Sequence, residues 1–199
     1  TGADVFTKTP ATLRQRLFFM PFVLRLLALA FFIVALARPQ KSLSRQDVEV
    51  EGIDIIMAMD ISGSMLARDF KPDRLESAKK VASEFIAGRP NDRIGLVAFS
   101  GEAFLQSPLT SDHILLDTLF TALYSGMIDD GTAIGDGLGL SVYHLRKSQA
   151  ISKVIILITD GVNNSGAMDP ITAADIAALF GIRVYTIGVG TKGMAPFPV

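Results

Sequence analysis

Three loops of this 199-residue chain carry hydroxyl and carboxylate side chains at spacings that could hold a metal ion. In the first loop, Asp60, Ser62 and Ser64 alternate along a turn that contains a glycine. Thr132 opens a glycine-rich segment, and Asp160 directly follows an apolar run. All five donors are oxygen atoms, which a hard divalent cation such as Mg²⁺ or Mn²⁺ prefers and zinc or copper does not. The set therefore predicts a magnesium or manganese site, and it contains no nucleophile paired with a base.

The loops are expected to meet because of the strands that precede them. Four apolar runs are short and rich in Ile and Val, which is typical of strands buried on both faces of a parallel sheet. They are Ile53–Met59, Ile94–Phe99, Val154–Thr159 and Val184–Ile187. A further segment, Ala103–Thr110, is expected to turn back as a short antiparallel edge strand.

Helices are predicted in the gaps between these strands. Asp73 and Glu76 form a capping box before a helix with Leu75, Ala78, Val81 and Phe85 on one face. Asp169-Pro170 supplies a cap and a first-turn proline before Ile171–Phe180, and two more helices are expected over about 111–124 and 133–147. The alternation predicts a doubly wound, Rossmann-like α/β fold with a mostly parallel sheet, one antiparallel edge strand and helices on both faces.

Composition removes several classes of function. The net charge is −1 and there is no basic run, so nothing in the electrostatics indicates a nucleic-acid partner. The chain has no cysteine, which excludes disulfides and thiolate metal sites. It also lacks a P-loop and a Gly-x-Ser-x-Gly elbow, so ATPase and esterase activities are without their residues.

Residues 18–37 read FFMPFVLRLLALAFFIVALA and contain one charge, Arg25. This composition predicts a transmembrane helix. Two alternatives stay open, a buried core helix and a cleaved signal peptide, because Ala35-Leu36-Ala37 matches a cleavage pattern. Around this segment we expect a basic cytoplasmic or interfacial stretch over 1–17, a juxtamembrane linker over 38–51 and the folded domain over 52–199.

The five oxygen donors resemble the complete metal-ion-dependent adhesion motif of von Willebrand factor type A (VWA) domains, with a resemblance that runs from about Gly52 to Gly190. Longer stretches resemble the membrane-anchored bacterial VWA proteins of the aerotolerance (Bat) type. These stretches are MAMDISGSMLARDFKPDRLE, GEAFLQSPLT, DDGTAIGDGL and VIILITDGVNN.

The resemblance implies a protein-interaction module and no enzyme, in which the metal takes an acidic ligand from a partner. It further implies a bacterial inner-membrane location, a VWA domain facing the periplasm, and partners that include other VWA proteins and a MoxR-type AAA+ ATPase. A complete VWA fold would have a last strand and a last helix after the run that ends at Val189, and we expect both to be missing here.

Two other functions are compatible with parts of this sequence. Asp60 could be the nucleophile of a Mg²⁺-dependent phosphohydrolase, but that chemistry wants a second carboxylate where Ser62 stands. The chain could also be a structural subunit whose metal site is silent.

Several neighbouring residues have a simpler structural interpretation. Gly135, Gly137 and Gly139 are expected to let their helix pack closely against the sheet. Asp129 and Asp130 could be acids that bond the metal's ligands, but they are interpreted as solvated loop charges. Asn163-Asn164-Ser165 is a nominal glycosylation sequon, which has no meaning if the source is bacterial.

Overall fold

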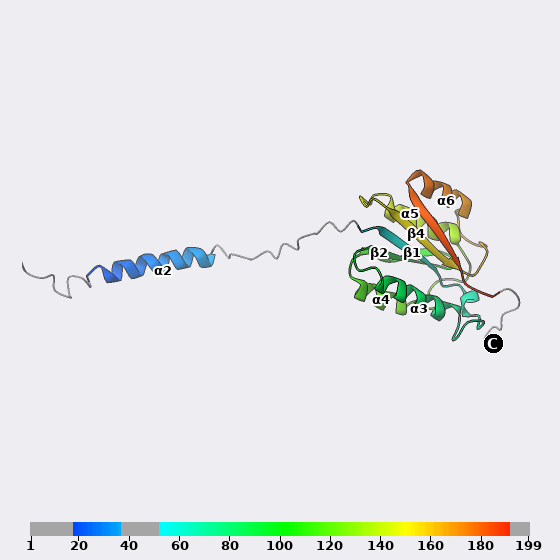
Figure 1. Ribbon diagram of the computed structural model, residues 1–199, viewed down its shortest axis with the longest axis horizontal. Helices are drawn as coiled ribbons and strands as arrows, with labels where there is room; N and C mark the ends of the chain where they lie inside the picture. Colours follow the sequence, from blue (N-terminus) through cyan, green and yellow to red (C-terminus); the bar gives the residue numbers. More distant parts are fainter. Residues whose placement is uncertain (1–17, 37–51, 192–199) are drawn as a thin grey trace, which may run out of the picture. The chain divides into compact units, whose positions relative to one another are not determined.

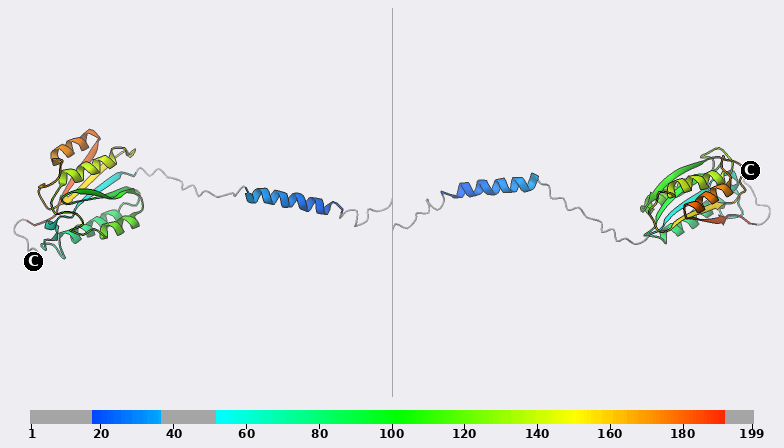
Figure 2. Two further views of the ribbon diagram at one scale, coloured as in Figure 1. Left: turned by 180° about the vertical axis from the view of Figure 1, so that it is seen from behind. Right: turned by 90° about the horizontal axis from the view of Figure 1, so that it is seen from above.

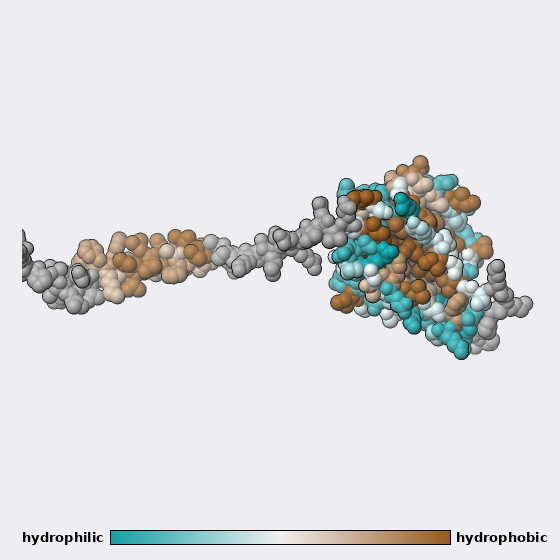
Figure 3. Space-filling view, in the orientation of Figure 1, coloured by the Kyte–Doolittle hydropathy of each residue, from teal (hydrophilic) through white to brown (hydrophobic). Residues whose placement is uncertain are grey.

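The computed structural model describes residues 18–36 and 52–191, which belong to two separate units, Thr1–Asp47 and Val48–Val199. The first unit contributes the helix α2 (Met20–Leu36), whose side chains are all exposed and apolar apart from Arg25 (Figure 3). The sequence predicted a helix in this segment, over residues 18–37. In the described part of the chain, however, no helix is both long enough and apolar enough to cross a membrane. The segments expected over 1–17 and 38–51 lie outside the described residues.

The second unit contains a five-stranded sheet with the order β3-β2-β1-β4-β5 (Figure 1). The strands are β1 (Asp54–Asp60), β2 (Arg93–Phe99), β3 (Ala103–Thr110), β4 (Lys153–Thr159) and β5 (Ile182–Gly188). β1 pairs in parallel with β2 and β4, β5 pairs in parallel with β4, and only β3 is antiparallel, at the edge. The predicted mostly parallel sheet with one antiparallel edge strand is confirmed, and the four parallel strands all end at the same side of the sheet.

Helices cover both faces of the sheet, as Figure 2 shows from behind and from above. One face packs against α3 (Arg74–Ala87) and α4 (His113–Thr121), and the other packs against α5 (Ile134–Leu145) and α6 (Pro170–Leu179). Every residue of β1 is buried, because this central strand has helices on both sides.

The helix caps follow the prediction, but one helix face does not. The Asp73 carboxylate accepts from the backbone N–H of Glu76, and Asp169 caps α6 in the same way. Val81 was expected on the buried face of α3 and is 61% exposed. The buried residues of α3 are Leu75, Ala78, Lys79, Ala82 and Ile86. This stripe differs because α3 packs against α4 as well as the sheet, and the Lys79 ammonium reaches the backbone oxygen of Thr121 at 3.3 Å.

The sheet face that carries α3 is only partly covered in residues 52–191. Tyr185 and Ile187 of β5 are about half exposed, and a groove of about 350 Å³ runs between them and Phe85 of α3. Figure 3 shows apolar residues gathered on this side of the unit. The last strand and last helix of a complete VWA fold would follow β5, where residues 192–199 lie outside the described part of the chain, so their expected absence stays a prediction.

Candidate metal-binding site at the strand ends

The first loop of the site begins at the last residue of β1. The Asp60 carboxylate accepts from the backbone N–H of Ser62 at 2.9 Å, which closes a tight turn. The short helix η1 (Gly63–Leu66) follows, and its first N–H donates to the Asp130 carboxylate at 2.9 Å. Asp130 is exposed, as expected of a solvated loop charge, and its carboxylate in addition fixes the turn that presents Ser64.

The loops after β1 and β4 meet through side-chain hydrogen bonds. The Oγ atoms of Ser62 and Ser64 lie 3.0 Å apart, and the Ser64 hydroxyl donates to Asp160 Oδ1 at 2.7 Å. Thr132 lies against the loop after β4, since a Cβ on Gly161 would come within 3.6 Å of Thr132 Oγ1, and the neighbouring Asp130 contacts the first loop at Gly63. The structure thus brings all three predicted loops together. We call Asp60, Ser62, Ser64, Thr132 and Asp160 the strand-end cluster.

The topology of the sheet explains this convergence. β1 and β4 are adjacent parallel strands, but the chain leaves β1 toward α3 on one face and leaves β4 toward α6 on the other. Loops that diverge to opposite faces open a crevice at the carboxyl ends of the strands, where ligands bind in open α/β sheets. The strand-end cluster lies at this end of the sheet, and its Asp160 lines a hollow there.

Burial sets the electrostatics of the cluster. Burial of Asp60 raises the pKa of its carboxyl, and the nearby charge of Asp160 raises it further, while hydrogen bonds from Ser62 and Thr159 lower it. The Thr159 hydroxyl donates to Asp60 Oδ2 at 2.5 Å, so both oxygens of this carboxylate are engaged. Because Ser64 is exposed, the cluster opens to solvent on its side.

Thr132 is positioned by a residue that sequence reasoning set aside. The Asn164 side-chain oxygen accepts from the Thr132 N–H at 2.8 Å, and the Asn164 N–H donates to the Thr132 carbonyl oxygen at 3.1 Å. From the sequence, Asn163-Asn164-Ser165 was considered only as a glycosylation sequon, and this contact was not predicted. Asn164 ties the start of α5 to the loop after β4.

Two charged residues beside the cluster were not singled out in the sequence. The Arg74 guanidinium donates through Nη1 to Asp160 Oδ2 at 2.5 Å, and through Nε and Nη2 to the Asp69 carboxylate at 2.7 and 2.8 Å. The ion pair lowers the pKa of Asp69 well below its usual range and raises that of Arg74. Arg74 and Asp160 also line a surface hollow of about 400 Å³ next to the cluster.

The donor set fits a hard divalent cation only if the hydroxyls take part. In residues 18–36 and 52–191, no three His, Cys, Asp or Glu side chains gather as a metal-binding group. The strand-end cluster contains two carboxylates, so Ser62, Ser64 and Thr132 would have to supply the other protein ligands. Neutral hydroxyl oxygens are acceptable to Mg²⁺ and Mn²⁺, which also keep bound waters.

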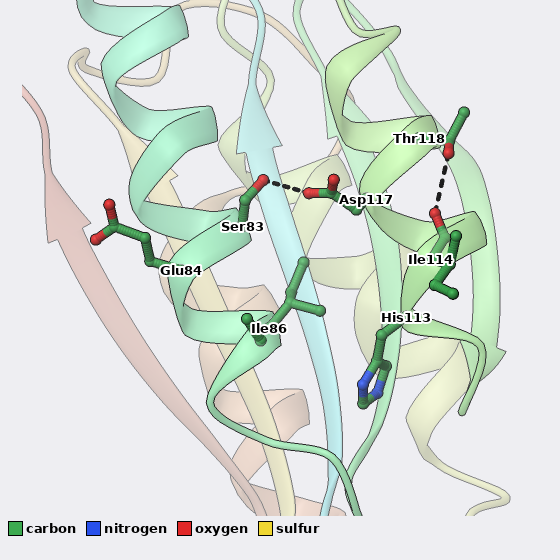
Figure 4. A pocket seen from close by; sticks show the side chains of 8 residues that line it. Ser83, Glu84, Ile86, His113, Ile114, Asp117 and Thr118 are labelled. Carbon is green, nitrogen blue, oxygen red and sulfur yellow. Dashed lines mark hydrogen bonds between the residues drawn. The ribbon is translucent and has the colours of Figure 1, made fainter.

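A second hollow, of about 550 Å³, lies between α3 and α4 (Figure 4). Four of the polar side chains that line it already bond one another or the backbone, namely Ser83, Asp117, His113 and Thr118. The Ser83 hydroxyl donates to the Asp117 carboxylate, and the Thr118 hydroxyl donates to the Ile114 carbonyl oxygen at 2.9 Å. The crevice at the strand ends is therefore the better candidate for a functional site.

Comparison with known proteins assigns this arrangement to a family. Residues 54–196 match the model of the von Willebrand factor type A domain. Among solved structures, the chain is similar to an aerotolerance-related membrane protein from Bacteroides fragilis, with 38% identity, a TM-score of 0.69 and coverage of 74% of this chain and 73% of that one. It is also similar to BatB from Bacteroides thetaiotaomicron, with 40% identity, a TM-score of 0.70 and coverage of 74% and 72%.

A more distant structure bears on metal binding. Proximal thread matrix protein 1 from the mussel byssus was solved with a zinc-occupied metal-ion-dependent adhesion motif, and it is 26% identical with a TM-score of 0.58. That match covers 70% of this chain and 38% of the mussel chain. The chain spans between 52% and 60% of the length of the curated relatives that it matches.

Proposed function

Because the chain belongs to the von Willebrand factor type A domain family, we propose that its strand-end cluster is a metal-ion-dependent adhesion site that binds a protein partner. Asp60, Ser62, Ser64, Thr132 and Asp160 would hold Mg²⁺ or Mn²⁺. The observation that carries the proposal is the contact of Ser64 with both Ser62 and Asp160, which joins donors from two loops 96 residues apart. The zinc-occupied motif of the mussel protein supports divalent occupancy of such a site.

The expected partner chemistry follows from the ligand charges. Three neutral hydroxyls leave a divalent cation less neutralised than a site built from carboxylates alone, and Mg²⁺ keeps open or water-filled positions. A bound cation would therefore supply a place for an Asp or Glu side chain from another protein. We propose other VWA proteins and a MoxR-type ATPase in a bacterial envelope complex as the first partners to test.

Removal of the Thr132 hydroxyl tests the metal site. Thr132→Val keeps the shape of this buried side chain, and we expect it to weaken Mn²⁺ binding by at least about tenfold, measured by calorimetric titration of the full chain. Ser141→Ala is the matched control, because Ser141 is a buried hydroxyl in α5 that bonds the Gly137 carbonyl oxygen. Ser141→Ala should leave Mn²⁺ affinity within about twofold of the unmodified chain.

The outcomes separate the proposed function from the alternatives. Saturable Mn²⁺ binding that Thr132→Val weakens supports an adhesion site, and a chain that binds no Mn²⁺ would instead be a structural subunit with a silent site. The phosphohydrolase alternative has less support, because that chemistry wants a second carboxylate two residues after Asp60 and Ser62 stands there.

We also propose that α2 attaches the protein to a bacterial inner membrane, with the VWA domain in the periplasm. A helix that is exposed and apolar along its length gains by leaving water. The description of the Bacteroides fragilis relative as a membrane protein supports this attachment.

The attachment is tested by charging α2. The full chain should float with phosphatidylethanolamine and phosphatidylglycerol vesicles in a density gradient, and the double variant Leu27→Asp with Ile33→Asp should stay at the bottom. Each aspartate at the centre of an inserted helix costs about 3 kcal/mol. Leu179→Asp, at an exposed position of α6, is the control and should float. Flotation of the double variant would contradict the attachment through α2.

A further inference from the structure

Arg74 is held between two carboxylates at the edge of the strand-end cluster. It is the first residue of α3, whose start is fixed by the Asp73 cap. Two of its nitrogens donate to Asp69 and a third donates to Asp160. Its side chain is only 12% exposed, and those of Asp69 and Asp160 are 5% and 0% exposed. Ion pairs this far removed from water are screened much less than those at the surface.

The segment that follows β5 makes further contacts with this ion-pair group. The backbone N–H and the hydroxyl of Thr191 donate to Asp69 Oδ2 at 2.8 and 3.0 Å. Gly190 lies against the guanidinium with a φ of 149°, and a Cβ there would come within 3.1 Å of Arg74 Nη2. Arg74 is therefore fixed in place and cannot move away from Asp160 without breaking these contacts.

The two oxygens of Asp160 face different cations. Oδ1 accepts from Ser64 and so faces the cluster, whereas Oδ2 accepts from Arg74. A divalent cation in the cluster would share this carboxylate with the guanidinium. Two positive groups that share one carboxylate repel each other, and each weakens the attraction between the carboxylate and the other.

We propose that Arg74 is a built-in counter-cation of the strand-end cluster, which balances Asp160 when no metal is present and weakens the hold of the cluster on a divalent cation. The inference rests on the proposed metal site and explains how that site would keep a bound cation in need of an acidic ligand. Asp69 is a positioning residue in this scheme, since it takes up part of the charge of Arg74 and aims Nη1 at Asp160.

Charge variants on the two sides of Asp160 test the proposal through opposite changes in affinity. Arg74→Gln removes the competing cation, and we expect the full chain to bind Mn²⁺ about tenfold tighter by calorimetry. Asp69→Asn leaves the guanidinium with Asp160 as its only charged partner among the described residues and should weaken Mn²⁺ binding severalfold. Arg74→Lys keeps the charge and should stay within about threefold of the unmodified chain.

Arg93→Gln is the matched control for loss of an arginine. Arg93 makes a similar two-point ion pair with the buried Asp54 at the opposite end of β1, about 20 Å away by the rise of a strand. At that distance and physiological ionic strength its charge is largely screened from the cluster. Mn²⁺ affinity should therefore be unchanged in this variant.

A purely structural role for Arg74 predicts a different pattern. If Arg74 only orients Asp160, Arg74→Gln and Asp69→Asn would both weaken Mn²⁺ binding, and the counter-cation would be overturned. A chain that binds no Mn²⁺ would refute the proposed function. In that case, Mn²⁺ binding by the Arg74→Gln variant would still support the proposed counter-cation role of Arg74. If neither protein bound Mn²⁺, that role would be overturned as well.

Discussion

Asp60→Asn is expected to weaken Mn²⁺ binding by about 100-fold while leaving the metal-free protein as stable as the unmodified chain or more stable. The side chain lies at the end of β1 with no exposed surface, and burial raises its pKa because a charged carboxylate is costly away from water. Asparagine has the same shape and no charge, so it removes this cost and the repulsion from Asp160. We therefore expect a higher free energy of unfolding without metal.

The measurement combines Mn²⁺ titration with thermal unfolding in a chelator. Asp54→Asn is the matched control, since Asp54 is equally buried at the other end of β1 and pairs with Arg93 and Ser148. We expect Asp54→Asn to lower stability, because Arg93 loses its charged partner, and to leave Mn²⁺ affinity unchanged. Mn²⁺ binding by Asp60→Asn as tight as that of the unmodified chain would contradict the ligand role of Asp60.

Gly135→Ala is expected to destabilise the domain by about 3 kcal/mol or more, although alanine normally favours a helix over glycine by about 1 kcal/mol. A Cβ at Gly135 would come within 1.9 Å of the Met168 carbonyl oxygen, a backbone atom. That backbone cannot easily shift, because the Asp136 carboxylate accepts from the N–H groups of Ala167 and Met168. The start of α5 and the segment before α6 would have to separate.

Thr132 connects this packing defect to the metal site. It lies three residues before Gly135, so displacement of the start of α5 should also move its hydroxyl and weaken Mn²⁺ binding. Urea unfolding followed by circular dichroism measures the stability. Gly88→Ala is the control, because a Cβ there meets only ordinary contacts at 3.6 Å and longer. Gly135→Ala with unchanged stability would show that the contact with Met168 is easily relaxed.

The glycines of α5 illustrate how far a local pattern can be interpreted. Close packing was expected for Gly135, Gly137 and Gly139, against the sheet beneath the helix. Gly137 does lie against the sheet, since its Cβ would come within 2.8 Å of the Phe99 ring in β2. Gly135 and Gly139 lie against Met168 instead. The glycine spacing in the sequence indicates that one face of the helix is closely packed. Which segment packs against that face depends on the path of the chain in the folded domain.

Much of the fold was predictable because its signals are local. Short apolar runs specify strands. Asp73 and Asp169 mark helix starts, because their carboxylates accept from backbone N–H groups two or three residues later. A strand followed by a polar turn places Asp60 and Asp160 at one side of a parallel sheet. The same reasoning predicted which five side chains would approach one another. Their role as metal ligands stays a prediction that the titrations test.

The sequence by itself therefore determined the α/β class, the antiparallel edge strand and the residues that stand at the strand ends. Only the tertiary structure decided which partners hold those residues in place. Arg74 reaches Asp160 across 86 positions, Asn164 reaches Thr132 across 32, and Thr191 reaches Asp69 across 122. No periodicity links residues so far apart, because their contacts depend on strand order and on the face to which each helix returns.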